Sequence, residues 1–128
     1  MNKEAMARMS AEELDEYGRV LGIEMRPAKT AAQKMALIGS KRDRTATVTA
    51  LGMQFEVPMK ALSDKRVTDV LSDAARTDAD VYRTLGLMLG EQMGELVDAV
   101  TDEDGTVDSA AIALAFVRII TSDELKNC

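Results

Sequence analysis

The segment Leu85–Ser109 constrains the fold most, because glycine and an acidic turn divide its apolar residues into short blocks. Apolar side chains recur at three- and four-residue spacing on both sides of Gly90, which predicts two short amphipathic helices instead of one long helix. Asp104-Gly105 then predicts a turn, and a third amphipathic run follows over Val107–Ile120. The segment therefore predicts several short helices joined by tight turns.

The first forty residues contain two signals for helix starts. Capping boxes, each a hydroxyl residue followed three positions later by Glu or Gln, begin at Ser10 and Thr30. They predict a helix over residues 11–21 and, after an extended connection, a second helix that Gly39 ends. The charged, unpatterned residues 40–44 predict a linker.

Residues 45–58 carry a different pattern, in which β-branched and apolar residues alternate with polar ones around a central Leu-Gly pair. This pattern predicts a β-hairpin, whose second strand Pro58 ends. Four helices follow, over about 63–73, 78–89, 91–100 and 108–120. The predicted fold is thus mainly α with a short β-hairpin: a small helix-extension-helix module with its linker in residues 1–44, and a hairpin plus four-helix domain in residues 45–128.

The last of these helices has the strongest apolar stripe. We expect its broad inward face to consist of Ile112, Phe116, Val117, Ile119 and Ile120, with Val107 at its entry. The polar residues 121–128 are expected to fray.

Composition bounds the size and character of the core. At 128 residues the chain is one ordinary domain, or a small domain with an appendage, and its 46% hydrophobic and 30% charged residues exclude a disordered chain. Aromatic residues make up only 3%, whereas methionine occurs nine times. A methionine-rich core is deformable and suits a protein that repacks around partners, although methionine also simply replaces leucine in helices.

Charge is unevenly distributed along the chain. The net charge is -6, but residues 1–44 hold nine Lys/Arg and seven Asp/Glu, whereas residues 45–128 hold seven and fifteen. The acidic character therefore belongs to the C-terminal domain. Because nucleic acids and anionic membrane surfaces are also negative, this charge disfavours nonspecific binding to either.

The chain lacks the residues and motifs of most active sites. It has no histidine and a single cysteine, Cys128, which excludes zinc and the commonest general base. Glycine-rich nucleotide cradles and the nucleophile elbow are absent. A calcium-binding EF-hand loop starting at Asp102 is excluded as well. Such a loop needs Gly at its sixth position and Glu at its twelfth, and here these positions are Val107 and Ala113. We therefore expect no catalytic, cofactor or metal residues, and a protein that is not an enzyme and works by binding.

Targeting signals are also missing from the sequence. No apolar run is long enough to span a bilayer, and Met1–Ser10 lacks the apolar centre of a signal peptide. With no cysteine pair for a disulfide, a reducing compartment is expected, and the protein should stay where it is made.

The pattern of residues 10–39, helix, Leu-Gly-Ile, Pro-Lys-Thr, helix, resembles the SAP type of helix-extension-helix module, which in many proteins binds DNA. The first helix carries four acidic residues that would repel the phosphates of DNA: Glu12, Glu13, Asp15 and Glu16. The cations available to help are Arg26, Lys29, Lys34, Lys41, Arg42 and Arg44, and such a cluster is also typical of a solvated linker. The resemblance implies an alternative function, a SAP-like DNA-binding or regulatory protein with an acidic dimerisation domain.

A second resemblance covers residues 45–128. It is carried by Val57-Pro58, by the Leu89-Gly90-Glu91-Gln92 junction, by Asp102–Gly105 and by the ending Leu125-Lys126-Asn127. This order of elements resembles the tail assembly chaperones of long-tailed, siphovirus-like phages and prophages. Residues 1–44 depart from a minimal member, so their role is unassigned.

That family implies a function in virion assembly. Such a chaperone acts in the host cell cytoplasm, binds the tape measure protein, keeps its long helices soluble, helps recruit tail tube protein and is absent from the mature virion. In many members a ribosomal frameshift near the stop codon appends a second domain. A structural virion protein, such as a head-tail connector, is a third possibility.

The partner-binding surface predicted from the sequence consists of apolar residues on the two short helices. We expect Met88, Leu89, Met93 and Val97 to meet apolar stripes on tape measure helices, while surrounding acidic residues keep the complex soluble. The same four residues suit an intramolecular core equally well, because buried and binding faces look alike in sequence. A homo-oligomer is also left open.

Overall fold

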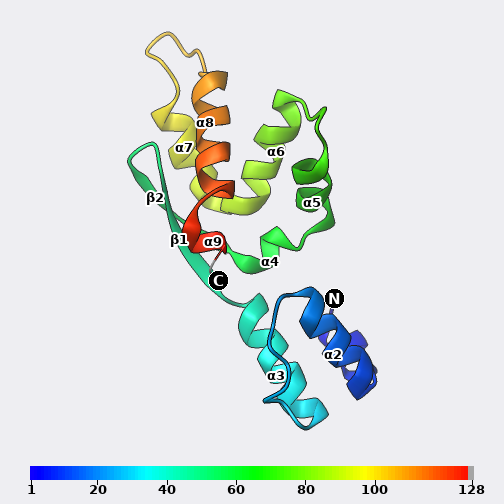
Figure 1. Ribbon diagram of the computed structural model, residues 1–128. Coiled ribbons are helices and arrows are strands. Elements are labelled where there is room, and N and C mark those ends of the chain that lie inside the picture. The colour runs from blue at the N-terminus through cyan, green and yellow to red at the C-terminus, as the bar shows by residue number, and fades with distance from the viewer. Residues whose placement is uncertain (127–128) are drawn as a thin grey trace. The chain divides into compact units, whose positions relative to one another are not determined.

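The computed structural model of the protein, which describes residues 1–126, is mainly helical with one short antiparallel hairpin (Figure 1). This confirms the predicted fold class. The chain divides into two compact units, Met1–Arg44 and Thr45–Cys128. Each unit is described by itself below.

The first unit contains three helices, α1 (Lys3–Ala7), α2 (Ala11–Val20) and α3 (Ala31–Arg42). Both predicted capping boxes are present, with Ser10 preceding α2 and Thr30 preceding α3. Helix α1 was not predicted from the sequence, and Asn2 caps it by accepting a hydrogen bond from the Ala5 N–H. The four buried side chains that form the core of this unit are Met6, Leu14, Met25 and Ile38.

Helix α3 differs from the prediction at its C-terminal end. It passes through Gly39 and ends at Arg42, so residues 40–42 form its last turn and are not a linker. Two features favour the extra turn: Ile38 is fully buried, which anchors the helix beside Gly39, and Lys41 and Arg42 place positive charge at the helix C-terminus. The Arg42 guanidinium also donates a hydrogen bond to the Met1 carbonyl, at 2.8 Å.

The second unit begins with the predicted hairpin, β1 (Thr45–Ala50) paired antiparallel with β2 (Met53–Pro58). Residues alternate between exposed and buried along β1, so one face of the hairpin is apolar. The turn places Leu51 and Gly52 at positive φ, 53° and 76°. Positive φ at both central residues is typical of the two-residue turn whose backbone twist matches that of the paired strands.

Up to residue 126, the hairpin is followed by six α-helices and one short 3-10 helix: α4 (Met59–Leu62), α5 (Lys65–Ser72), α6 (Asp78–Leu89), η1 (Gly90–Gln92), α7 (Met93–Ala99), α8 (Ser109–Ile120) and α9 (Asp123–Lys126). The four longer ones correspond to the predicted helices. Asp64 caps α5 by accepting a hydrogen bond from the Arg66 N–H, and Ser63, with which the predicted helix began, instead follows the end of α4, which was not predicted. Gly90 ends α6 as predicted, at a φ of 56°.

The core of this unit lies where α6 and α8 pack together and α8 meets the inner face of the hairpin (Figure 1). Helix α8 faces this core with Ile112, Ala115, Phe116 and Ile119, which recur at helical spacing. The prediction for Val117 was wrong, because it lies on the opposite side of α8 and is 47% exposed. Ile120 is half-buried.

Gln92 joins the hairpin to the helices. Its amide oxygen accepts a hydrogen bond from the Glu56 backbone N–H, and its amide nitrogen donates one to the Glu56 carbonyl, both at 2.8 Å. The same nitrogen also donates to the Leu89 carbonyl, at 3.1 Å. The side chain therefore pairs with the edge of β2 as a neighbouring strand would.

The C-terminal end is more ordered than the sequence suggested. Residues Asp123–Lys126 form α9, which packs against β1, and Leu125 is buried in the core of the unit. The expectation that residues 121–126 fray was therefore wrong, since one apolar side chain suffices to hold this turn. Asn127 and Cys128 lie outside the described residues.

Candidate binding surfaces

The acidic turn before α8 is held by one backbone hydrogen bond and one side-chain hydrogen bond within the turn. Asp102 donates its backbone N–H to the Thr106 carbonyl at 2.8 Å, and Thr106 donates its own to the Asp104 carboxylate at 2.9 Å. This second hydrogen bond lowers the pKa of Asp104, because it favours the charged carboxylate. Within residues 1–126, no group of three or more His, Cys, Asp or Glu side chains is placed to hold a metal ion. In the same part of the chain, no helix is both long and apolar enough to cross a membrane.

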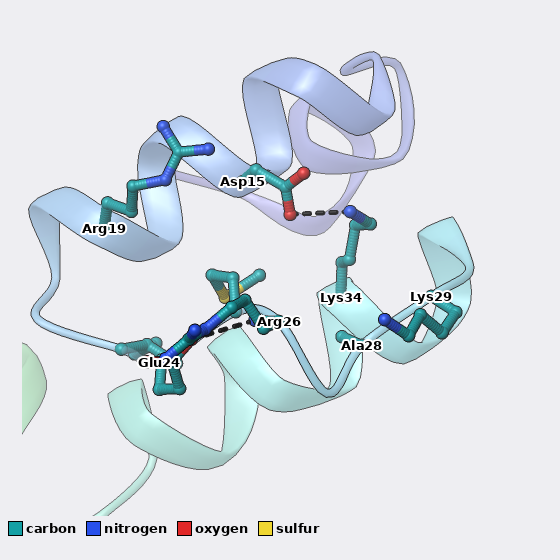
Figure 2. A pocket seen from close by; sticks show the side chains of 9 residues that line it. Asp15, Arg19, Glu24, Arg26, Ala28, Lys29 and Lys34 are labelled. Carbon is teal, nitrogen blue, oxygen red and sulfur yellow. Dashed lines mark hydrogen bonds and ion pairs between the residues drawn. The ribbon is translucent and has the colours of Figure 1, made fainter.

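A charged hollow of about 520 Å³ lies in the first unit, between α2, the extended connection and α3 (Figure 2). Its floor includes the apolar side chains of Ile23, Met25 and Ala28. Lys34 and Asp15 form an ion pair of 2.6 Å across it, in which the Lys34 side chain is only 10% exposed. Because little of the Lys34 side chain is exposed, the Asp15 carboxylate compensates its ammonium for much of the contact with water that it loses.

Exposed charges line the mouth of the same hollow. Arg26 donates two hydrogen bonds to the Glu24 carboxylate, at 2.8 and 3.1 Å. The guanidinium lowers the pKa of Glu24, and the carboxylate raises the pKa of Arg26. Arg19 and Lys29 also line the hollow, and neither has an ion pair within the described part of the chain.

These contacts reduce the number of cations that are available to bind phosphate. Of the six, Arg26 and Lys34 are engaged by carboxylates, and Arg42 by the Met1 carbonyl. On the neighbouring helix, Glu12 and Glu16 are exposed. Internal pairing and exposed acids both reduce the positive potential that a phosphate backbone needs.

The structure places the four predicted partner-binding residues mostly inside the second unit. Met88 is fully buried and Leu89 is 3% exposed, and both belong to the core cluster. Met93 and Val97 are half-buried. The intramolecular alternative thus accounts for Met88 and Leu89, which are not available to a partner in this conformation.

An exposed apolar surface lies elsewhere on the second unit, where α6 and α8 run side by side (Figure 1). Between them is a hollow of about 220 Å³, which we call the α6–α8 groove. It is lined by Asp78, Ala79, Val81, Tyr82, Val107, Ser109, Ile112 and Ala113. Tyr82 and Val107, at 45% and 43% exposed, form its accessible apolar rim.

The groove continues onto what we call the α8 outer face, formed by Ala110, Ala113, Leu114 and Val117. All four are exposed, Leu114 by 48% and Val117 by 47%. They recur at helical spacing, so they form one stripe opposite the core-facing stripe of the same helix. Sequence reasoning missed this surface because it assigned Val117 to the core. The signal was present, since α8 is apolar almost all round and Arg118 is its one charged residue.

Acidic residues gather at one end of this surface. Asp78 lines the groove, and Asp108 caps α8 by accepting hydrogen bonds from the Ala110 and Ala111 N–H groups, at 3.0 and 3.1 Å. The opposite end is bordered by Arg118. The surface is therefore apolar along its length and charged at its ends, with the acidic charge near the start of α8.

Comparisons of this chain with protein-family models, with curated proteins and with solved structures find no match.

Proposed function

We propose that this protein is a phage tail assembly chaperone, a non-catalytic protein that binds the tape measure protein and keeps it soluble during tail tube assembly. The proposal takes its partner from the sequence resemblance of residues 45–128. The observation that carries it is the exposed apolar surface over α6 and α8, on a unit with a strong excess of acidic residues. A contiguous apolar patch of this kind marks a site of interaction with another polypeptide.

The charge of the second unit suits such a role. Residues 45–128 hold fifteen Asp/Glu against seven Lys/Arg, so this unit contributes a strong negative charge to any complex that it forms. Net charge keeps complexes soluble through mutual repulsion. Methionines at the margin of the core add adaptability, since Met53, Met59 and Met93 are partly buried and unbranched.

Co-expression with a fragment of a tape measure protein, which the proposal expects to be encoded beside this gene, tests the proposal. We expect the fragment to move from the insoluble to the soluble fraction and to co-purify with the full-length chain. An unrelated small protein of similar isoelectric point serves as the control for acidity alone. Failure of the chain to exceed that control in fragment solubility would contradict the proposal.

Virion composition provides a second test. A chaperone that acts in the host cell cytoplasm leaves before the particle is complete, so we expect mass spectrometry of purified virions to lack its peptides. Stoichiometric peptides in the particle would favour a structural role, such as a head-tail connector.

A SAP-like DNA-binding function is the second candidate, and one observation favours it. The first unit is built as helix, extension and helix, and Arg19 and Lys29 at its hollow have no ion pair within the described residues. A gel shift with duplex DNA separates the two functions, because phosphate contacts give retention that weakens steeply as salt rises. We expect no retention at low salt, and salt-sensitive retention would favour this second function instead.

A further inference from the structure

We infer that the α6–α8 groove and the α8 outer face together dock one amphipathic helix of a partner protein, with Lys or Arg at the end that lies over Asp78 and Asp108. The inference rests on the proposed function and supplies its partner-binding surface. It places that surface away from Met88 and Leu89, which are buried.

The dimensions of the surface fit a helix better than a small molecule. The groove holds about 220 Å³, less than the roughly 300–1,000 Å³ of small-molecule sites, so it accommodates a single apolar side chain. From Ala110 to Val117 the outer face extends about 10 Å at the helical rise, which corresponds to two turns of a partner helix. One anchor in the groove and a stripe along α8 match the spacing of apolar residues on an amphipathic helix.

The charges at the ends of the surface select the partner. Asp78 and Asp108 attract a basic end of the docked helix, whereas Arg118 at the other end attracts an acidic residue. A second copy of this chain is disfavoured as the occupant, because two units that each hold fifteen acidic and seven basic residues repel each other. The partner is therefore a different polypeptide with cationic residues beside its apolar stripe.

Binding of synthetic helical peptides to the full-length protein tests the inference. The probe is an 18-residue amphipathic peptide with a leucine stripe and lysines at one end, and a matched peptide carries glutamates in place of the lysines. The variant Leu114→Gln/Val117→Gln removes the apolar stripe with residues that suit a helix. Val20→Gln is its control, because Val20 is an 83% exposed valine on the other unit.

We expect the lysine peptide to bind the wild type and the Val20→Gln variant equally, and the double variant about tenfold or more weakly. Asp78→Asn/Asp108→Asn should weaken binding and flatten its salt dependence, while asparagine retains the cap of α8. Circular dichroism checks that the variants stay folded. Three outcomes would each overturn the inference. The first is that the Leu114→Gln/Val117→Gln variant binds the lysine peptide as tightly as the wild type does, and the second is that the wild type binds the glutamate peptide equally well. The third is that the wild type is a dimer and Leu114→Gln/Val117→Gln makes it a monomer.

The same variants separate this inference from the proposed function. If Leu114→Gln/Val117→Gln still solubilises the tape measure fragment as well as the wild type, the function stands and the docking site is wrong. If the peptide binds at the groove but the wild type leaves the fragment insoluble, the docking site stands and the proposed client is wrong.

Discussion

The two units of this protein differ in the size of their apolar cores. Residues 1–44 close around four buried apolar side chains, and a part-buried ion pair links α2 to α3. Residues 45–128 build a continuous core from the hairpin and the helices, and still leave apolar side chains on the surface of α8. The small unit therefore depends on a few apolar contacts and a polar contact to stay folded, whereas the larger one has a core extensive enough to leave a face for binding.

The largest expected contrast comes from matched core truncations. Ile38 and Ile119 are both fully buried, so changing either to alanine should cost about 2–5 kcal/mol. The first unit is near the size of about 40 residues below which chains rarely fold alone, so Ile38→Ala should unfold it. Ile119→Ala should lower the stability of the second unit without unfolding it. Hydrogen exchange resolved by segment measures both, and unchanged protection of residues 1–44 in Ile38→Ala would break the contrast.

Loss of the amide that joins the hairpin to the helices should be the next largest effect. Gln92→Ala removes three hydrogen bonds, two to Glu56 and one to the Leu89 carbonyl, at a cost of about 2–3 kcal/mol. Gln54→Ala is the matched control, because Gln54 is an exposed glutamine on β2, the strand that Gln92 contacts. Urea midpoints compare the two, and equal midpoints would show that the Gln92 contacts do not stabilise the unit.

The polar contact inside the first unit should behave asymmetrically. Asp15→Ala leaves Lys34, whose side chain is 10% exposed, without its partner, which should destabilise the unit by about 1–3 kcal/mol. Lys34→Met should cost less, because it removes the buried charge and leaves the more accessible Asp15 to water. Protection of α2 and α3 in hydrogen exchange reports both changes. If Lys34→Met destabilises the unit more than Asp15→Ala does, the attraction between the two charges outweighs the free-energy cost of removing them from water.

Matched glycine substitutions should have opposite effects on the stability of the two units. A Cβ at Gly18 would overlap the buried Met25 side chain, so Gly18→Ala should destabilise the first unit by about 1–2 kcal/mol. At Gly86 the space is open, so Gly86→Ala should stabilise α6 by up to about 1 kcal/mol through helix propensity. Thermal unfolding of each variant gives the sign: a stabilising Gly18→Ala would refute the close packing at Gly18, and a destabilising Gly86→Ala would refute the open space at Gly86.

The smallest effect concerns pH and the start of α5. The Arg66 guanidinium and backbone N–H lower the pKa of Asp64 to about 2, from 3.8. Because the folded pKa is depressed, the stabilisation is complete above about pH 4 and is lost as the pH falls toward 2. Asp64→Asn retains a cap but lacks this charge, so its melting temperature should lie slightly below that of the wild type at pH 7. A difference that persists unchanged at about pH 2 would contradict this assignment.

Local signals in the sequence predicted most of the secondary structure. The capping boxes at Ser10 and Thr30, the alternation along the hairpin and the stop at Gly90 act within a few residues, so their effects are visible without the fold. The errors arose where a distant contact decided the outcome. Helix α3 runs past Gly39 beside the buried Ile38, and α9 forms where Leu125 reaches the core.

The candidate binding surface was harder to predict than the fold. Helix α8 is apolar on almost all sides, so periodicity alone could not say which stripe faces inward. The contacts of α8 with α6 and β1 settled this, burying Phe116 and leaving Val117 exposed. For Met88 and Leu89 the sequence left both a core and a partner-binding role open, since their spacing fits either, and the structure buries both side chains.

The sequence by itself determined the helical blocks, the hairpin, the acidic charge of residues 45–128 and the lack of histidine, because these follow from residue type and local spacing. Only the tertiary structure decided which apolar stripe was buried, which cations of the first unit were already paired, and that Gln92 contacts β2. Those outcomes depend on residues far apart in the chain meeting in space, and a binding surface is the part of an apolar face that such meetings leave uncovered.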